Sequence, residues 1–205
     1  MNFRNRSVNI DTTIRCTLEC PKCQRQALRQ MDKRIPGQDI PMDDFVKIAK
    51  YFKRGVNFCG QMSDPIFHPN FIDMLKYCYE NNVNTRIATA ASHKKSSWYK
   101  KAFLANKNAQ WVFGIDGLPK DSHKYRINQD GVHLFEMMKM ANNLGLLVVW
   151  QCIVFRYNEN DIDECKRIAK ENNIYFDLNM SGRWKNDDPY KPRNPKYYLN
   201  SKRRI

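Results

Sequence analysis

Three cysteines lie within one short run of this sequence: Cys16, Cys20 and Cys23, in the segment Cys-Thr-Leu-Glu-Cys-Pro-Lys-Cys. Thiolates this close together on one loop can converge on a single metal centre. Three sulfurs satisfy only three corners of a tetrahedron or a cubane, so one coordination site stays open. Because an open site on redox-active iron is where chemistry takes place, the spacing indicates a reactive iron–sulfur centre.

Two other interpretations of these cysteines stay open. The three thiols could form part of a zinc site completed by a distant His or Cys, or they could be buried thiols. A zinc finger normally brings a second close pair of ligands, and the four histidines show no such pairing: His68, His93, His123 and His133. The other four cysteines are also far apart, and we expect each to be a small apolar residue: Cys59, Cys78, Cys152 and Cys165. We do not expect an all-cysteine disulfide framework, because seven cysteines is an odd number and the chain is too long to need one.

Length and composition predict one domain in a reducing compartment. The chain has 205 residues, enough for a sizeable core, and it contains no apolar run of transmembrane length. The first residues, Met-Asn-Phe-Arg-Asn-Arg, lack the apolar stretch of a signal peptide. We therefore expect a cytoplasmic protein with no membrane association.

The formal charge of +14 is large and is steepest at the C-terminus. After Gly182, eight cations face only two acids, Asp187 and Asp188: Arg183, Lys185, Lys191, Arg193, Lys196, Lys202, Arg203 and Arg204. Aromatic residues that could stack on bases lie between them: Trp184, Tyr190, Tyr197 and Tyr198. This pattern predicts a polyanionic partner, a nucleotide or nucleic acid, although a solvated basic tail without any partner has the same composition.

Short β-rich runs alternate with helical runs along the chain. The expected strands are 7–14, 56–59, 83–89, 111–115, 146–155 and 174–178. The expected helices are 43–54, 71–81, 96–105, 131–143 and 159–172. Parallel neighbours need such crossovers, so the pattern predicts an α/β fold with a parallel sheet and outer helices. Six units fit the length and eight do not, which indicates a partial (β/α)6 TIM-like barrel over residues 1–180 and a basic tail over 181–205. Barrel enzymes carry their chemistry at the C-terminal ends of the strands, where the cysteine loop falls.

The cysteine spacing resembles that of the radical S-adenosylmethionine (radical SAM) superfamily. The resemblance implies that Cys16, Cys20 and Cys23 hold a [4Fe–4S] cluster, and that its fourth iron binds the amino and carboxylate groups of SAM. It also implies the partial barrel, and it extends over roughly residues 7–178. No second cysteine-rich region follows, so the core is expected without an auxiliary-cluster domain.

The segment Met62-Ser63-Asp64-Pro65 resembles the Gly-Gly-Glu-Pro loop of that family. The resemblance implies that Ser63 and Asp64 bind the methionyl ammonium. Asp64 replaces the usual Glu, and Met62-Ser63 replaces both glycines, so the backbone geometry is expected to differ. Without the family, this segment is a proline-rich turn.

Weaker matches to the family follow later in the chain, and Lys22 departs from its pattern. Gly114-Ile115-Asp116-Gly117, followed by Arg126, resembles the end of the fourth strand in the peptide-maturase and molybdenum-cofactor subgroup, with Gly114 in place of a serine. The resemblance implies that Asp116 orients the site and that Arg126 attracts a carboxylate. Gln151, polar in an apolar strand, is expected to point into the barrel, unless it lies at an exposed edge. Lys22 stands where relatives carry an aromatic residue.

The resemblance implies reductive cleavage of SAM to a 5′-deoxyadenosyl radical that abstracts hydrogen from a substrate. A flavodoxin- or ferredoxin-like donor is the expected source of the electron. Charge favours a nucleotide or nucleic acid as the substrate, and the subgroup resemblance favours a peptide or small metabolite. Two alternatives remain: a zinc-stabilised basic nucleic-acid-binding module, and a degenerate family member that binds SAM poorly.

Overall fold

The computed structural model describes residues 3–182, 184–185 and 187–197. Its centre is a sheet of six parallel strands in the order β1-β2-β3-β4-β5-β6, the same order as in the chain. The strands are β1 Ser7–Ile10, β2 Gly55–Phe58, β3 Thr85–Thr89, β4 Gln110–Gly114, β5 Val148–Ile153 and β6 Tyr175–Asn179. No pairing joins β1 to β6, so the sheet is open among the described residues. The predicted parallel α/β fold is confirmed.

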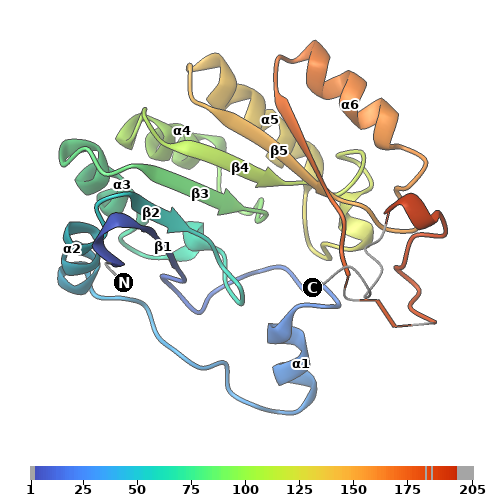
Figure 1. The fold of residues 1–205 in the computed structure, drawn as a ribbon, viewed down its shortest axis with the longest axis horizontal. Helices are drawn as coiled ribbons and strands as arrows, with labels where there is room; N and C mark the ends of the chain where they lie inside the picture. Colours follow the sequence, from blue (N-terminus) through green and yellow to red (C-terminus); the bar gives the residue numbers. More distant parts are fainter. Residues whose placement is uncertain (1–2, 183, 186, 198–205) are drawn as a thin grey trace.

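Helices follow the strands. They are α1 Gln24–Gln30, α2 Met42–Tyr51, α3 Phe71–Glu80, α4 Ser96–Ala105, α5 Gly131–Asn143 and α6 Ile162–Glu171. Short 3-10 turns cover Phe3–Asn5, Pro65–Phe67, Ser122–Lys124 and Pro195–Tyr197. Helices α2 to α6 cover one face of the sheet, and α1 lies apart from them on the other side (Figure 1). No helix in the described ranges has the length and apolar character needed to cross a membrane.

The core lies between the sheet and α2 to α6. On α3, Phe71, Met74, Leu75 and Cys78 recur at helical spacing and are all buried. Phe71 meets the β4 residue Trp111 edge to face, with 6.2 Å between ring centroids. Burying an aromatic side chain of this kind contributes about 1.5–3 kcal/mol, so this layer holds the helices on the outer face.

The opposite, inner face of the sheet carries small side chains near the strand ends. Ala88 of β3 pairs in register with Val112 of β4, and Gly114 pairs with Gln151 of β5. Ala90, just past the end of β3, lies on the same face. Closed barrels fill this layer with bulky branched residues. Here the small residues leave room for a cavity.

Most element boundaries differ from the prediction by one to three residues, and two differences are larger. The first strand ends at Ile10 and not at residue 14, because pairing with β2 stops at Ile10 and Phe58 and the next residue, Asp11, binds the loop after β2. Helix α1 was not predicted, since its run Gln-Arg-Gln-Ala-Leu-Arg-Gln has no apolar stripe.

The segment after β6 packs on the core where it is described. Arg156 holds this segment by hydrogen bonds. Its backbone N–H donates to the Tyr190 carbonyl at 2.9 Å, and its side chain donates to the Lys191 and Asp188 carbonyls. The division at residue 180 stays a prediction. Part of the predicted basic tail lies outside the described residues: Arg183, Tyr198, Lys202, Arg203 and Arg204.

Candidate functional site

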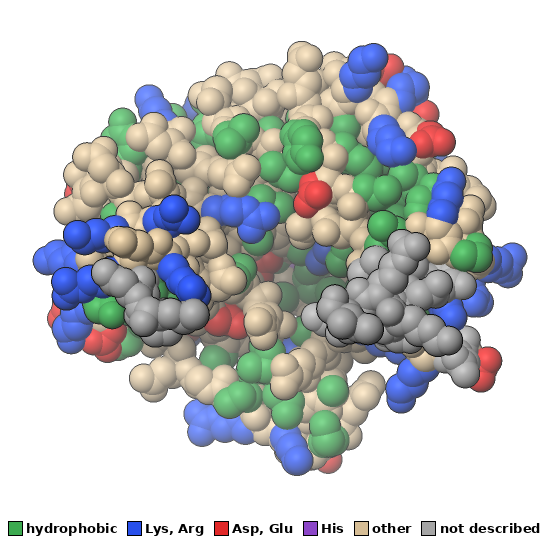
Figure 2. Space-filling model, in the orientation of Figure 1, with side chains coloured by type: hydrophobic (Ala, Val, Ile, Leu, Met, Phe, Trp, Pro, Cys, Tyr) green, Lys and Arg blue, Asp and Glu red, His purple; other side chains and the backbone are tan. Residues whose placement is uncertain are grey.

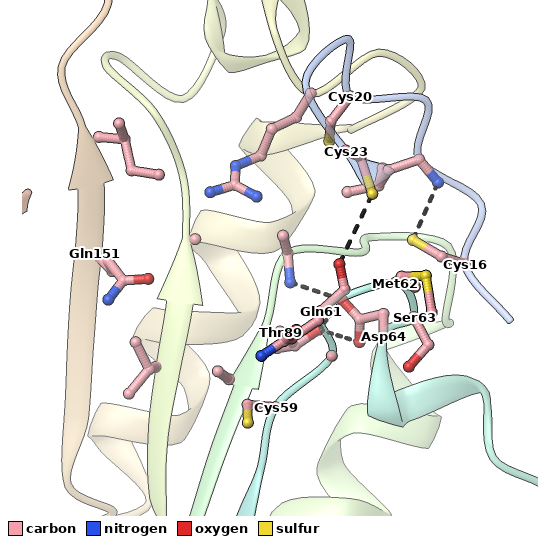
Figure 3. A pocket seen from close by; sticks show the side chains of 18 of the residues that line it. Cys16, Cys20, Cys23, Cys59, Gln61, Met62, Ser63, Asp64, Thr89 and Gln151 are labelled. Carbon is pink, nitrogen blue, oxygen red and sulfur yellow. Dashed lines mark hydrogen bonds between the residues drawn. The ribbon is translucent and has the colours of Figure 1, made fainter. Parts of the chain in front are cut away.

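The cysteine loop lies at the C-terminal ends of the strands, as predicted. Cys16, Cys20 and Cys23 all line one cavity of about 300 Å³ (Figure 3). Four other predicted site residues line the same cavity: Ser63, Asp64, Arg126 and Gln151. Asp116 does not line it and lies buried behind Arg126. The fold therefore brings most of the predicted site residues together, while their roles as ligands stay predictions.

Backbone contacts fix the cysteine loop at several points. The Asp64 N–H donates to the Arg15 carbonyl at 2.9 Å, and the Glu19 N–H donates to the Ile127 carbonyl at 3.1 Å. Within the loop, the Cys23 N–H donates to the Cys20 carbonyl at 2.9 Å, which makes a turn that leads into α1. The loop is thus held by segments far away in the sequence.

Arg25, on α1, holds the cysteine loop by hydrogen bonds to two backbone carbonyl groups. Its guanidinium donates to the Ile14 carbonyl and, at 3.3 Å, to the Met62 carbonyl. It is a buried cation whose charge lowers the pKa of the Cys16 thiol and so favours the thiolate, the form that binds metal.

The thiols are those of free cysteines in a partly buried setting. Burial raises the pKa of the Cys16 thiol to about 12 and that of the Cys20 thiol to about 11. The Cys23 thiol faces the Gln61 carbonyl at 3.9 Å, and Cys16 Sγ accepts from the Leu18 N–H at 3.4 Å. Because metal binding requires thiolates, a bound metal centre would supply the positive charge that offsets their desolvation.

In the ranges that the structure describes, no three His, Cys, Asp or Glu side chains are grouped closely enough to hold a single metal ion. A tetrahedral zinc site requires its ligands to converge on one point. An iron–sulfur cluster is held by several thiolates and spreads its metal over several irons. The three thiols around the shared cavity could supply the thiolates that such a cluster needs.

Asp64 is buried, and its carboxylate is fully occupied by the protein. It accepts from the backbone N–H groups of Ile66, Ala90 and Ala91 at 3.3, 2.8 and 2.9 Å, and from the Thr89 hydroxyl. A carboxylate offers about four lone-pair sites, and four donors fill them here. Burial raises the pKa of Asp64, while these donors lower it. The side chain joins the loop after β2 to the end of β3.

The loop from Gly60 to Ser63 is held by a residue outside the predicted set. Asp11 accepts from the Gln61 N–H at 3.0 Å, the Met62 N–H at 3.4 Å and the Ser63 hydroxyl. Gly60 is required at its place, because a Cβ there would lie 1.7 Å from the Ser63 carbonyl oxygen. The family's two glycines are absent, and a glycine just before them makes the tight turn.

Asp116 and Arg126 bind each other. Arg126 Nε lies 2.8 Å from Asp116 Oδ2, and the Ile153 N–H donates to Asp116 Oδ1 at 2.8 Å. The Arg126 side chain is 14% exposed and that of Asp116 is fully buried. A Cβ at Gly114 would lie 2.9 Å from Arg126 Nη2, so the guanidinium occupies the space that a serine side chain would need. This explains the glycine at a position where the resembled family has serine.

Gln151 points inward from β5, as predicted, and faces β6. Its Nε2 lies 3.4 Å from Asp177 Oδ2, which also accepts from Asn179 Nδ2 at 2.9 Å. A second cavity of about 360 Å³ adjoins the first and shares Gln151, Lys22 and Tyr125 with it.

Lys22 crosses from the cysteine loop to the C-terminal segment. Its Nζ lies 2.5 Å from Asp188 Oδ2, with side-chain exposures of 33% and 0%. Tyr190, close by, contacts Tyr125 edge to face at 5.1 Å, and Tyr125 stacks on Phe155 at 4.0 Å. This contact seats the segment beside the second cavity.

Three positioning residues escaped the sequence analysis: Asp11, Asp188 and Gln129. Gln129 is buried, and its Nε2 donates to the carbonyls of Ala90 at 2.5 Å and Gly114 at 2.9 Å. It joins the ends of β3 and β4 under the cavity. No local sequence pattern identifies a single Asp or Gln as a residue that holds two loops together, because its hydrogen-bond partners lie far away in the chain.

Comparisons with known proteins give a match in structure only. No protein-family model matches the sequence, and no curated protein matches it. Among solved structures, Streptococcus suis SuiB bound to S-adenosylmethionine matches with a TM-score of 0.74 and 18% identity, over 94% of this chain and 44% of that one. Methylornithine synthase (PylB) matches with a TM-score of 0.65 and 13% identity, over 87% of this chain and 54% of that one.

A third match is anSMEcpe with bound AdoMet and the Cp18Cys peptide, at a TM-score of 0.63 and 14% identity, over 97% of this chain and 56% of that one. All three are radical SAM enzymes. The chain shares the fold of these three proteins. It spans about half the length of these proteins or less. At such identities the radical SAM likeness establishes the fold and leaves the reaction to be argued from the site.

Proposed function

We propose that this protein is a radical SAM enzyme in which Cys16, Cys20 and Cys23 hold a [4Fe–4S] cluster and the adjoining cavity holds SAM. The observation that carries the proposal is the opening of three thiols from one loop into a single cavity, at the C-terminal ends of a parallel sheet lined with small residues. Active sites of barrel enzymes lie at that end. Three thiolates leave one iron free for a further ligand.

When bound, such a cluster supplies the single electron that cleaves SAM to methionine and a 5′-deoxyadenosyl radical. The chain's own residues hold the cavity and the cysteine loop in position. Asp64 and Gln129 fix the strand ends, and Arg25 fixes the loop. Arg126 lines the cavity, and in the described residues its Nη1 has no hydrogen-bond partner, which suits it to receive a carboxylate of SAM.

The substrate that we infer is a peptide or a small metabolite. Two cations line the cavity, Lys22 and Arg126, and each is paired with a buried carboxylate. The cavity therefore has little excess positive charge to hold a polyanion. The anSMEcpe structure carries a peptide beside AdoMet, which supports a peptide on this core.

A nucleotide or nucleic acid is the second candidate substrate, favoured by the net charge of +14. The same charge favours an acidic flavodoxin- or ferredoxin-like protein as the electron donor, since opposite charge accelerates association. Neither partner is required for SAM cleavage itself.

Anaerobic reconstitution with iron and sulfide, followed by reduction and an assay for 5′-deoxyadenosine, tests the proposal. We expect a brown protein that forms 5′-deoxyadenosine from SAM. Cys20→Ala should lose both the cluster absorbance and the product. Cys78→Ala is the matched control, because Cys78 is buried in α3 away from the cavity, and it should keep both.

Two outcomes would contradict the proposal. A colourless protein with tightly bound zinc would favour the zinc-stabilised binding module. A brown protein that forms no 5′-deoxyadenosine would favour a degenerate member of the family.

A further inference from the structure

A third cavity, with a mainly polar lining, lies at the opposite end of the sheet, where the strands begin. It has a volume of about 310 Å³ and lies beside the first residues of β1, β3 and β4. Its polar lining consists mainly of two arginines and four amides: Arg54, Arg86, Asn57, Asn84, Asn108 and Gln110. None of its lining residues lines the cysteine cavity.

Strand register explains why this end is polar. Arg86 of β3 pairs with Asn57 of β2 on one side and with Gln110 of β4 on the other. Side chains paired across neighbouring strands lie on the same face, and Arg86 alternates with Ala88, which lines the cysteine cavity. The three side chains thus form one row on the inner face, below the cysteine cavity. In closed barrels such a row is filled with branched apolar side chains.

The charge in this row is not balanced by the protein. Neither Arg54 nor Arg86 makes a side-chain hydrogen bond or ion pair within the described ranges, and no Asp or Glu lines the cavity there. Arg86 is half-buried in the middle of a sheet. A guanidinium that has no carboxylate partner and lies beside several side-chain amides is suited to bind an anionic ligand.

The donors around Arg86 fit an oxygen-rich anion. Asn57 Nδ2 is engaged with Asn9 Oδ1 at 2.9 Å and Asn84 Nδ2 with the Arg54 carbonyl at 3.4 Å, but the side-chain amides of Asn108 and Gln110 have no partner among the described residues. A planar guanidinium donates two parallel hydrogen bonds to two oxygens of a phosphate or carboxylate group, and side-chain amide N–H groups can donate to the remaining oxygen lone pairs.

We propose that this cavity is a binding site for an oxyanion, a phosphate or carboxylate group of a small molecule, held mainly by Arg86 with Arg54 at the rim. The site is separate from the cysteine cavity and does not depend on SAM chemistry. It places a ligand inside the same barrel, beneath the reaction site.

Calorimetric titration of the protein with inorganic phosphate, at constant ionic strength in chloride buffer, tests the site. We expect saturable binding to one site per chain. Arg86→Gln should weaken it about tenfold or more, since a hydrogen bond to a charged group contributes about 1.5–3 kcal/mol. Arg54→Gln removes an exposed rim cation, is expected to fold normally, and should also weaken binding. Parallel titrations with sulfate and with acetate distinguish a tetrahedral anion from a carboxylate, and saturable binding of either kind at Arg86 supports the site.

Arg34→Gln is the matched control. Arg34 is an exposed arginine outside the barrel, in the segment between α1 and α2, and its removal should leave the affinity unchanged. The proposal is overturned if no oxyanion gives saturable heat beyond chloride, or if the Arg86 and Arg54 variants bind with the affinity of the wild type, as the Arg34 control should.

Discussion

At the scale of residues, three buried carboxylates determine the walls of the cysteine cavity. Asp64 is satisfied by four donors, Asp116 by Arg126 and Asp188 by Lys22. A buried charge is tolerated only where it is paired or hydrogen-bonded, so each of these contacts also fixes a loop in place. The cavity is therefore shaped before any ligand enters, which lowers the ordering cost of binding.

Asp64→Asn tests this role of Asp64. The amide keeps the shape of the side chain but turns one acceptor oxygen into a donor that faces backbone N–H groups. Leaving such groups unsatisfied costs about 1–3 kcal/mol each, so we expect the free energy of unfolding to fall by about 2–4 kcal/mol in urea titrations.

Asp73→Asn is the control for that measurement. Asp73 is an exposed acid in the first turn of α3, 3.7 Å from Lys76, where neutralisation costs at most about 1 kcal/mol. Equal losses in the two variants would show that the contacts of Asp64 are not what holds the loop.

At the scale of elements, the cysteine loop and the segment after β6 are coupled by one ion pair. Lys22 stands between two of the cysteines, and Asp188 is also bound by the Tyr190 N–H at 3.0 Å. Arg156, after β5, donates hydrogen bonds to the Tyr190 and Lys191 carbonyl groups of the same segment. The first and last units of the sheet therefore meet at the mouth of the second cavity.

Asp188→Asn should loosen this contact. Removing the charge leaves Lys22 without its partner, and we expect faster hydrogen exchange at the amides of residues 188–191, with a loss of about 1–3 kcal/mol in unfolding free energy. Asp187→Asn is the matched control, because Asp187 is next to Asp188 in the sequence and is exposed. Unchanged exchange in the Asp188 variant would mean that the aromatic contacts alone seat the segment.

The elements themselves follow closely from the sequence, and the cross-connections do not. Helices α4 and α5 have the predicted bounds because their apolar spacing is local information. The cysteine loop was found from spacing alone. By contrast, the pairing of Lys22 with Asp188 joins residues far apart in the chain, and it depends on strand order and on how the last segment turns back. The occupied carboxylate of Asp64 could not be foreseen either, since its donors come from the end of β3.

At the scale of the whole molecule, the positive charge is spread over the face that Figure 2 shows. Figure 2 shows Lys and Arg side chains distributed around this face, among acidic and apolar ones, and not gathered over one element. The cations that line the cysteine cavity are paired. Charge of this kind attracts polyanions in general and does not direct them into the cavity.

We therefore expect single-stranded oligonucleotides to bind outside the cavity. Fluorescence anisotropy should show an affinity that falls steeply as salt rises, because surface contacts release counterions. Gln151→Ala, which alters the lining of both cavities at the cysteine end, should change that affinity less than twofold. Binding that is insensitive to salt, or that is lost in this variant, would instead favour a nucleic acid as the substrate.

The strand order has a consequence for how the protein is made. Each strand pairs with the one synthesised just before it, so the sheet can grow from β1 to β6 as the chain leaves the ribosome. The three thiols precede β2 in the chain, and Asp188, which binds the lysine between two of them, follows β6. The contact between the cysteine loop and the segment after β6 can therefore form only once all six strands have been made.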